Sequence, residues 1–159
     1  MIRTATPADR AEILEIYTRA RQFMRDTGNP TQWGDTYPPE ELIDEDISKG
    51  YTHVYQSNGR IQAVFVRIPW DDPTYQVILG GWLNYRPYWA VHRVASRGEE
   101  KGAAARCLNW CVEQSGNVRI DTHDNNLPMQ RMLEKTGFVK CGHIWLENGD
   151  PRIAYQKSK

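Results

Sequence analysis

A glycine-containing turn between a strand and an alanine-rich helix is the part of this sequence best suited to bind a ligand. It reads "SRGEEKGAAA" over residues 96–105. The first N–H groups of a helix lack intrahelical partners and lie at the positive end of the helix dipole, so such a turn can hold a phosphate. Arg97 and Lys101 are nearby cations, and small residues open the backbone to close approach at Gly102, Ala103 and Ala104. A polar turn before a good helix former is the plainer alternative.

The strand before this turn offers a second set of candidate side chains. The stretch "YWAVHRVAS" has the composition of a strand, and strict alternation places four residues on one face: Tyr88, Ala90, His92 and Val94. Histidine readily changes its charge near neutral pH, so His92 is a candidate proton acceptor. A histidine that is simply hydrogen-bonded within the sheet is the alternative.

Composition limits the classes of partner. The chain has 159 residues, with 20 Lys plus Arg and 20 Asp plus Glu, so its formal net charge is zero. This balance argues against nucleic acid or an anionic membrane as the main partner. No apolar run approaches the roughly 18 residues needed to span a bilayer. The first residues lack the apolar core of a signal peptide, so we expect a cytoplasmic protein.

The three cysteines do not indicate a metal site. Cys107 and Cys111 lie four residues apart in a helical pattern and share a face, but no further ligand has suitable spacing. We expect reduced, buried thiols and no metal.

The elements that must position these residues follow from periodicity, caps and turn signals. The expected order is β-α-α-β-β-irregular-β-α-β-α-β-β. Helices are expected over residues 6–26, 38–50, 99–116 and 125–137, and strands over residues 2–6, 88–96, 117–123, 138–146 and 152–158. Residues 51–68 read as a hairpin around Asn58-Gly59. The segment 69–87 is ambiguous, with a short helix expected around residues 75–79.

This order predicts one α/β (α+β) domain over residues 1–159. The strand-helix-strand arrangement over residues 88–121 implies a parallel pair joined by a crossover helix, whereas the hairpins are antiparallel. We therefore expect a mixed sheet with helices on both faces.

Two motifs, taken together and in order, resemble the GNAT (GCN5-related N-acetyltransferase) superfamily over essentially the whole chain. The family's loop pattern, Gln/Arg-x-x-Gly-x-Gly/Ala, falls on residues 99–104. Its downstream pattern, Asn-x-x-Ala-x-x-x-Tyr-x-x-x-Gly-Phe, falls on residues 126–138, "NLPMQRMLEKTGF". The resemblance implies a mostly antiparallel twisted sheet whose central parallel pair splays at a bulge. It also implies acetyl-coenzyme A as co-substrate and acetyl transfer to an amine.

The resemblance assigns coenzyme contacts to specific positions. Backbone N–H groups at Lys101, Gly102, Ala103 and Ala104 would hold the pyrophosphate, with Arg97 as the cation. Backbone near Val94 and Ser96 would pair with the pantetheine amides, and Asn126 and Met129 would contact the pantetheine arm. Asn126 is equally suited to be a helix N-cap. Met129 could instead be plain core packing.

Three departures from the family pattern bear on the chemistry. Glu99 and Glu100 occupy loop positions where the family has Gln or Arg and a glycine-rich backbone. Leu133 occupies the position of the frequent Tyr that protonates the leaving thiolate. Tyr155 on the last strand, or Cys141, could take over that role, and thiolate is itself a fair leaving group.

Direct attack requires a neutral amine, so a base or a water chain must take a proton. His92 is the first candidate for this base, and Tyr88 could hold a water beside it. His123, just after the next strand, is a second candidate near the acceptor.

Aromatic residues could line the acceptor site. An aromatic wall suits an amine, and the candidates are Trp33, Tyr37, Trp82 and Tyr85, with a purely stabilising role as the alternative. The predicted function is an acetyl-CoA-dependent N-acetyltransferase for the amine of a small molecule, amino acid or peptide. A catalytically weak acyl-CoA-binding module is the alternative, and exposed strand edges near the C-terminus are compatible with a homodimer.

Overall fold

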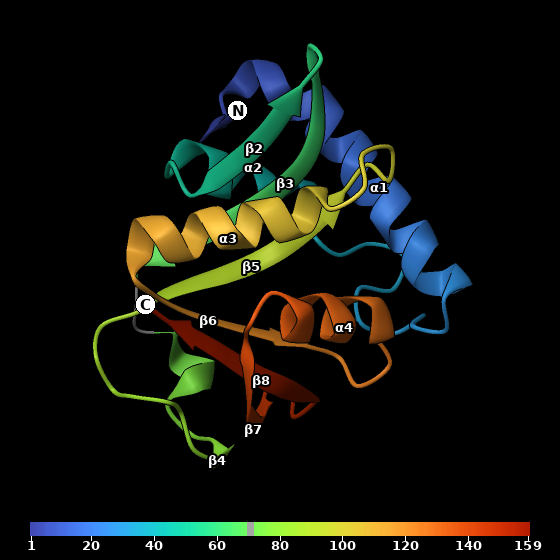
Figure 1. Ribbon diagram of the computed structural model, residues 1–159. Helices are drawn as coiled ribbons and strands as arrows, with labels where there is room; N and C mark the ends of the chain where they lie inside the picture. The colour runs from blue at the N-terminus through green and yellow to red at the C-terminus, as the bar shows by residue number, and fades with distance from the viewer. Residues whose placement is uncertain (70–71) are drawn as a thin grey trace. The chain divides into compact units, whose positions relative to one another are not determined.

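The computed structural model describes residues 1–69 and 72–159. In these residues, four α-helices accompany eight strands that are hydrogen-bonded in the order β1-β2-β3-β5-β6-β8-β7-β4 (Figure 1). β5 (Trp89–Ser96) and β6 (Asn117–Thr122) run parallel. The pairs β1-β2, β2-β3, β6-β8, β7-β8 and β4-β7 are antiparallel. This confirms the expected mixed, mostly antiparallel sheet.

The chain forms two compact units, each discontinuous in sequence. The first contains Met1–Arg67 and Arg93–Cys107, and the second contains Ile68–His92 and Leu108–Lys159. The single domain expected from the sequence stays a prediction. No helix in the described ranges is both long and apolar enough to cross a bilayer.

The first unit is built around two amphipathic helices. It contains β1 (Ile2–Thr4), the 3-10 turn η1 (Pro7–Asp9), α1 (Arg10–Asp26), α2 (Glu40–Ser48), β2 (Thr52–Ser57) and β3 (Arg60–Pro69). The Asp9 carboxylate accepts a hydrogen bond from the Thr6 N–H at 2.8 Å, which caps the 3-10 turn η1 that leads into α1. Residues at helical spacing on α1 are then buried with α2, namely Ile13, Ile16 and Tyr17 with Ile43 and Ile47.

The β2-β3 hairpin has helices on both of its faces. Asn58 and Gly59 take φ values of 55° and 73°, as a type I′ turn requires, and this confirms the predicted hairpin. Val54 belongs to the core cluster that contains α1 and α2. Its neighbour Tyr55 points to the other face, where the Arg106 guanidinium of α3 (Ala103–Ser115) lies 5.5 Å from its ring.

The second unit contains strands on both sides of β6 and the last helix, α4 (Leu127–Lys135). Its other elements include the 3-10 turn η2 (Pro73–Tyr75), β4 (Leu79–Gly80), β7 (Val139–Trp145) and β8 (Pro151–Ser158). α4 contacts β7, and Leu133 on α4 is fully buried (Figure 1). A core cluster on the sheet contains Tyr75, Trp82, Tyr88, Ala90, Ile144 and Ala154.

The prediction of a short helix around residues 75–79 is wrong. The only helical turn of that segment in the described residues is η2, which begins where Asp72 accepts from the Thr74 N–H at 2.9 Å. Leu79 and Gly80 instead pair with β7 as strand β4. This close pairing needs glycine, because a Cβ on Gly80 would collide with the backbone of β7. Residues 70–71 of the ambiguous segment lie outside the described residues.

The parallel pair is short, and a bulge interrupts β5. Within the described residues, β5 and β6 pair only at Trp89–Val118 and Ala90–Arg119. Arg93 takes φ 51°, a left-handed conformation that non-glycine residues seldom adopt within strands. The expected splay at a bulge is therefore confirmed. The alternation expected through Val94 is interrupted, because it assumed a regular strand across Arg93.

Candidate active site

One face of β6 supplies the charged groups of the candidate site in the second unit. Along β6 three polar residues alternate with buried Val118, Ile120 and Thr122, namely Asn117, Arg119 and Asp121. The parallel register places Ala90 beside Arg119, and the antiparallel register places Ala154 beside Asp121. Because side chains alternate between faces, Arg119 and Asp121 lie on one side of the sheet with Tyr88 and Ala90.

A buried amide network fastens the loop before β5 to this face. The Gln156 amide N–H donates to Asn117 Oδ1 at 2.8 Å, and Asn117 Nδ2 donates to Asn84 Oδ1 at 2.9 Å. Gln156 also accepts from the Leu83 N–H at 2.8 Å. Since buried polar groups are costly unless paired, this network holds the loop in one position.

Arg119 is buried between aromatic rings of that loop. Its Cζ lies 4.1 Å from the ring centroids of both Trp82 and Tyr88, and 5.9 Å from that of Tyr85. One guanidinium nitrogen donates to the Asn84 carbonyl at 2.8 Å. In the described residues Nε has no hydrogen-bond partner, and no carboxylate forms an ion pair with Arg119. Burial lowers the pKa of Arg119 from its usual value.

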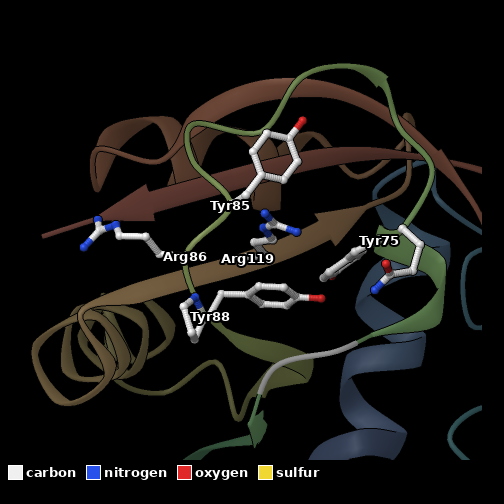
Figure 2. Close-up of a pocket in the computed structure, with 7 residues that line it drawn as sticks. Tyr75, Tyr85, Arg86, Tyr88 and Arg119 are labelled. Carbon is white, nitrogen blue, oxygen red and sulfur yellow. The ribbon is translucent and has the colours of Figure 1, made fainter.

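Arg119 opens onto a cavity of about 220 Å³. Figure 2 shows the guanidinium among the rings of Tyr75, Tyr85 and Tyr88, while the Arg86 side chain points away from them. The lining consists of Tyr75, Gln76, Tyr85, Arg86, Pro87, Tyr88 and Arg119. This lining contains two arginines and no carboxylate, so the charged groups at the cavity wall are positive.

His92 and Asp72 form a pair beside this cavity wall. His92 Nε2 lies 2.7 Å from Asp72 Oδ2, and the Asp72 N–H donates to the Tyr88 hydroxyl at 2.9 Å. Burial by itself would raise the pKa of Asp72, but hydrogen bonds from His92 and Thr74 outweigh it, and the pKa is lowered. With its proton on Nε2, His92 donates to Asp72 and keeps Nδ1 as its basic nitrogen.

A second carboxylate lies behind Tyr75. The Tyr75 hydroxyl donates to Asp121 Oδ2 at 2.7 Å, and the Tyr75 ring centroid lies 6.0 Å from those of both His92 and Tyr88. Burial raises the pKa of Asp121 and of Tyr75. Tyr75 therefore joins the cavity to the His92–Asp72 pair. Among the described residues no three His, Cys, Asp or Glu side chains are arranged to hold a metal.

The predicted phosphate loop belongs to the first unit. α3 begins at Ala103, and the Arg106 N–H donates to the Gly102 carbonyl at 3.0 Å. The Ala103 N–H donates to the Glu100 carbonyl at 3.4 Å, so the other N–H groups of the first turn are those that a ligand could use. Gly102 takes φ 79°, and a Cβ built there meets no atom within 4 Å. Lys101 is exposed. The loop therefore presents an open helix N-terminus.

Arg97 is not available to this loop, which corrects the expectation that it supplies a cation there. Its side chain is fully buried, with Nε donating to the Ile61 carbonyl at 2.8 Å. The other nitrogens donate to Glu15 at 2.9 Å and Glu12 at 3.0 Å. The guanidinium is therefore committed to fastening α1 onto β3.

The residues around α4 have defined local roles. Asn126 Oδ1 accepts from the Met129 N–H at 3.2 Å, which makes Asn126 the N-cap of α4. His123 Nδ1 accepts from the Asn125 N–H at 2.9 Å, so this nitrogen is occupied in the turn before the helix. Leu133, where the family pattern has Tyr, offers no hydroxyl. The coenzyme contacts expected at Val94, Ser96, Asn126 and Met129 stay predictions.

Tyr155 lies on the opposite face of β8 from the residues that flank Arg119 and Asp121. It alternates with Ala154 and Gln156 along the strand and is fully buried. Its hydroxyl has no hydrogen-bond partner among the described residues, and burial raises its pKa. Tyr155 and Tyr88, the two tyrosines that the sequence suggested as catalytic, therefore lie on opposite faces of the sheet.

The four candidate acceptor aromatics fall into two groups. Trp33 is buried in the first unit, with its ring 5.7 Å from Tyr17 and 6.1 Å from Tyr37. Neither Trp33 nor Tyr37 lines the cavity beside Arg119. Trp82 forms one wall of the Arg119 stack, and Tyr85 lines the cavity itself.

Sequence reasoning missed Asp72, Tyr75, Arg119 and Asp121. Asp72 and Tyr75 fall in the segment whose structure the sequence left ambiguous. The other two had a readable signal, because "NVRID" alternates polar and apolar residues on a strand between two helices. A polar face on such a buried strand indicates a site, since unpaired buried polar groups are otherwise costly.

Comparison with known proteins identifies the class. No protein-family sequence model and no curated protein matches the sequence. Among solved structures, a GNAT-family acetyltransferase from Streptococcus agalactiae 2603 is 32% identical, with a TM-score of 0.92 over 100% of this chain and 95% of that one. The chain therefore belongs to the GNAT family of acetyltransferases.

Two further structures share the fold. A protein from Staphylococcus aureus Mu50, provisionally assigned as an acetyltransferase, is 27% identical with a TM-score of 0.74, over 99% of this chain and 98% of that one. The protein yncA from Salmonella typhimurium, solved with its cofactor acetyl-CoA, is 17% identical with a TM-score of 0.65, over 99% of this chain and 92% of that one.

Proposed function

We propose that this chain is an acetyl-CoA-dependent N-acetyltransferase. It transfers the acetyl group by direct attack of the primary amine of a small molecule, an amino acid or a peptide. The observation that carries the proposal is the 2.7 Å contact between Asp72 and His92, which lies on β5, the strand that forms the short parallel pairing of this GNAT-family chain. Such a pair supplies the base that a protonated amine requires.

His92 takes the proton in this proposal. Asp72 accepts from Nε2, which fixes the tautomer and leaves Nδ1 to accept a proton from the attacking amine. The Asp72 carboxylate then stabilises the imidazolium that forms. Tyr88 and Thr74 hold Asp72 in place through its N–H and Oδ1.

Coenzyme binding rests on the first turn of α3 and the loop before it. The open space at Gly102 and the N–H groups of Lys101, Gly102 and Ala104 would accommodate a pyrophosphate, whereas the Ala103 N–H already donates to the Glu100 carbonyl at 3.4 Å. The other residues that would hold the coenzyme are Val94, Ser96, Asn126 and Met129. When bound, acetyl-CoA supplies an acetyl thioester, whose thiolate is a fair leaving group. The yncA structure with acetyl-CoA supports the choice of coenzyme.

Thiol release from acetyl-CoA with pooled amines tests the proposal. We expect the His92→Ala variant to lose roughly 100-fold or more in kcat, since a positioned base contributes about 10²–10⁴-fold. His143→Ala is the matched control, because His143 also lies near a carboxylate, Asp124 at 3.7 Å, outside the site. Full activity of His92→Ala would refute the base assignment.

The alternative is an acyl-CoA-binding module with little turnover. The absence of a hydroxyl at Leu133 and the commitment of Arg97 to glutamates favour it. Thermal stabilisation by coenzyme A, with no thiol release over the amine panel, would support this alternative instead.

A further inference from the structure

We propose that the cavity beside Arg119 binds a carboxylate of the acceptor, so that the acceptor is a small amino acid rather than a simple amine. The inference rests on the proposed function for the acetylation of the acceptor amine. Binding of the acceptor carboxylate, by contrast, can be measured without turnover. It assigns Arg119 as the residue that selects the acceptor.

The first support is the unbalanced charge of Arg119. The residue Arg119 is only 4% exposed, and a guanidinium is costly to bury unless an anion and hydrogen bonds compensate it. Two ring faces at 4.1 Å supply part of that compensation, and Asn84 accepts one hydrogen bond. Nε still has no partner among the described residues. A carboxylate bound in the cavity would provide the missing negative charge.

The second support is the character of the cavity. Arg119 is the buried cation of its wall, while Arg86 is exposed and donates to the Ser158 hydroxyl. One fixed positive charge matches a singly charged carboxylate better than a doubly charged phosphate. The volume of about 220 Å³ is small for a ligand pocket, since pockets for drug-sized ligands span roughly 300–1,000 Å³. An acceptor of amino-acid size fits this volume.

The third support is the path from the cavity to the candidate base. Tyr75 lines the cavity, and its ring lies 6.0 Å from that of His92. The acidic groups, Asp121 and Asp72, are bonded to Tyr75 and His92 respectively. The positive Arg119 therefore lies on the cavity wall, and the carboxylates of Asp121 and Asp72 lie on the far side of Tyr75 and beside His92. A ligand with a carboxylate at one end and an amine at the other matches that order.

The experiment compares each amino acid with two analogues that keep its amine. One analogue is its amide, which removes the negative charge, and the other is its aminophosphonate, which replaces the carboxylate. Two quantities are measured on the full-length protein: kcat/KM in thiol release with acetyl-CoA, and thermal stabilisation by each compound without acetyl-CoA. Arg119→Gln and Arg119→Lys are compared with Arg131→Gln, which removes an exposed arginine of α4.

We expect the wild type to prefer at least one amino acid over its amide by roughly 10- to 100-fold, as hydrogen bonds to charged groups imply. Arg119→Gln should abolish that preference by lowering kcat/KM on the amino acid toward the value on its amide, and Arg131→Gln should retain the preference. Arg119→Lys, which keeps the charge, should retain part of it and guards against misfolding of the glutamine variant.

The outcomes separate this inference from the proposed function. Turnover of amides as efficient as that of every amino acid overturns the carboxylate site but leaves the acetyltransferase intact. Arg119-dependent stabilisation by amino acids without any thiol release preserves the site and refutes the proposed function. Stronger binding of aminophosphonates, or no difference between wild type and Arg119→Gln, overturns the inference.

Discussion

Arg97 and Arg119 are both buried arginines, but their surroundings differ. Arg97, in the first unit, is 3% exposed and donates to two glutamates and a backbone carbonyl. Arg119, in the second unit, is 4% exposed and lies between two aromatic rings with one carbonyl acceptor. The two residues are therefore exposed to nearly the same small extent, but the balance of charge around their guanidinium groups differs.

This difference separates a structural arginine from a candidate binding arginine. Where carboxylates neutralise the guanidinium, nothing remains for a ligand, and the side chain only joins elements of the fold. Where the charge lacks a carboxylate beside a cavity, the protein carries an energetic cost that a ligand can offset. Perturbed charged groups gather at functional sites for this reason.

The sharpest test of the comparison is loss of the paired arginine. Arg97→Met should lower the free energy of unfolding by about 3 kcal/mol, because the Ile61 carbonyl loses its buried partner and two glutamates lose their common cation. Chemical denaturation measures this change. A loss below about 1 kcal/mol, the usual value for exposed pairs, would mean that the pairing is not structural.

A smaller effect is expected at a more exposed pair of the same unit. Arg3 donates to Asp9 at 2.8 Å, and this bond lowers the pKa of Asp9 from 3.8 to about 2. A carboxyl with a lowered pKa stabilises the fold above its unfolded pKa, and that stability is lost as pH falls toward 2. Asp9→Asn should therefore cost roughly 2 kcal/mol at most at pH 7, allowing for solvent screening.

Unfolding curves of wild type and Asp9→Asn between pH 7 and 2 check the sign. The two curves should differ at pH 7, draw together as the pH falls below about 4, and meet only near pH 2, where the carboxyl of the folded protein becomes protonated. A difference that persists unchanged to pH 2 would show that the charge of Asp9 contributes nothing.

The smallest effect on stability is expected where the charge has no carboxylate. Arg119→Met replaces the guanidinium with an apolar chain between Trp82 and Tyr88, so the free energy of unfolding should change by less than about 1 kcal/mol. Denaturation of this variant beside Arg97→Met compares the two sites directly. A cost for Arg119→Met as large as that for Arg97→Met would erase the distinction between them.

Local sequence signals were sufficient to predict most of the helices, strands and turns. The site was harder to predict, because its side chains have partners that are distant in the sequence. The Asn58-Gly59 turn and the N-cap at Asn126 depend on neighbouring residues, and both are found where expected. Arg97 was assigned to the loop because it lies beside it in sequence. Its true partners, Glu12 and Glu15, lie on a helix more than 80 residues earlier, which local patterns cannot connect.

The candidate base, His92, also has a partner that local sequence patterns could not reveal. Alternation on β5 correctly grouped Tyr88 with His92, since both contact Asp72. Asp72 itself lies in a segment without periodicity, so only the folded chain reveals it as the partner. Arg119 is an ordinary strand residue until the loop at 82–87 folds over it.

The stacking of Trp82 on Arg119 has a spectroscopic consequence. An indole ring 4.1 Å from a full positive charge experiences a strong local field, and this field shifts the energy of its excited state. Neutralising the charge with an anion changes the field and therefore the emission wavelength. The chain has 6 tryptophans, so subtracting the spectrum of a Trp82→Phe variant isolates this signal. The fluorescence of the ring that shields the guanidinium from water should therefore also report the binding of an anion to Arg119.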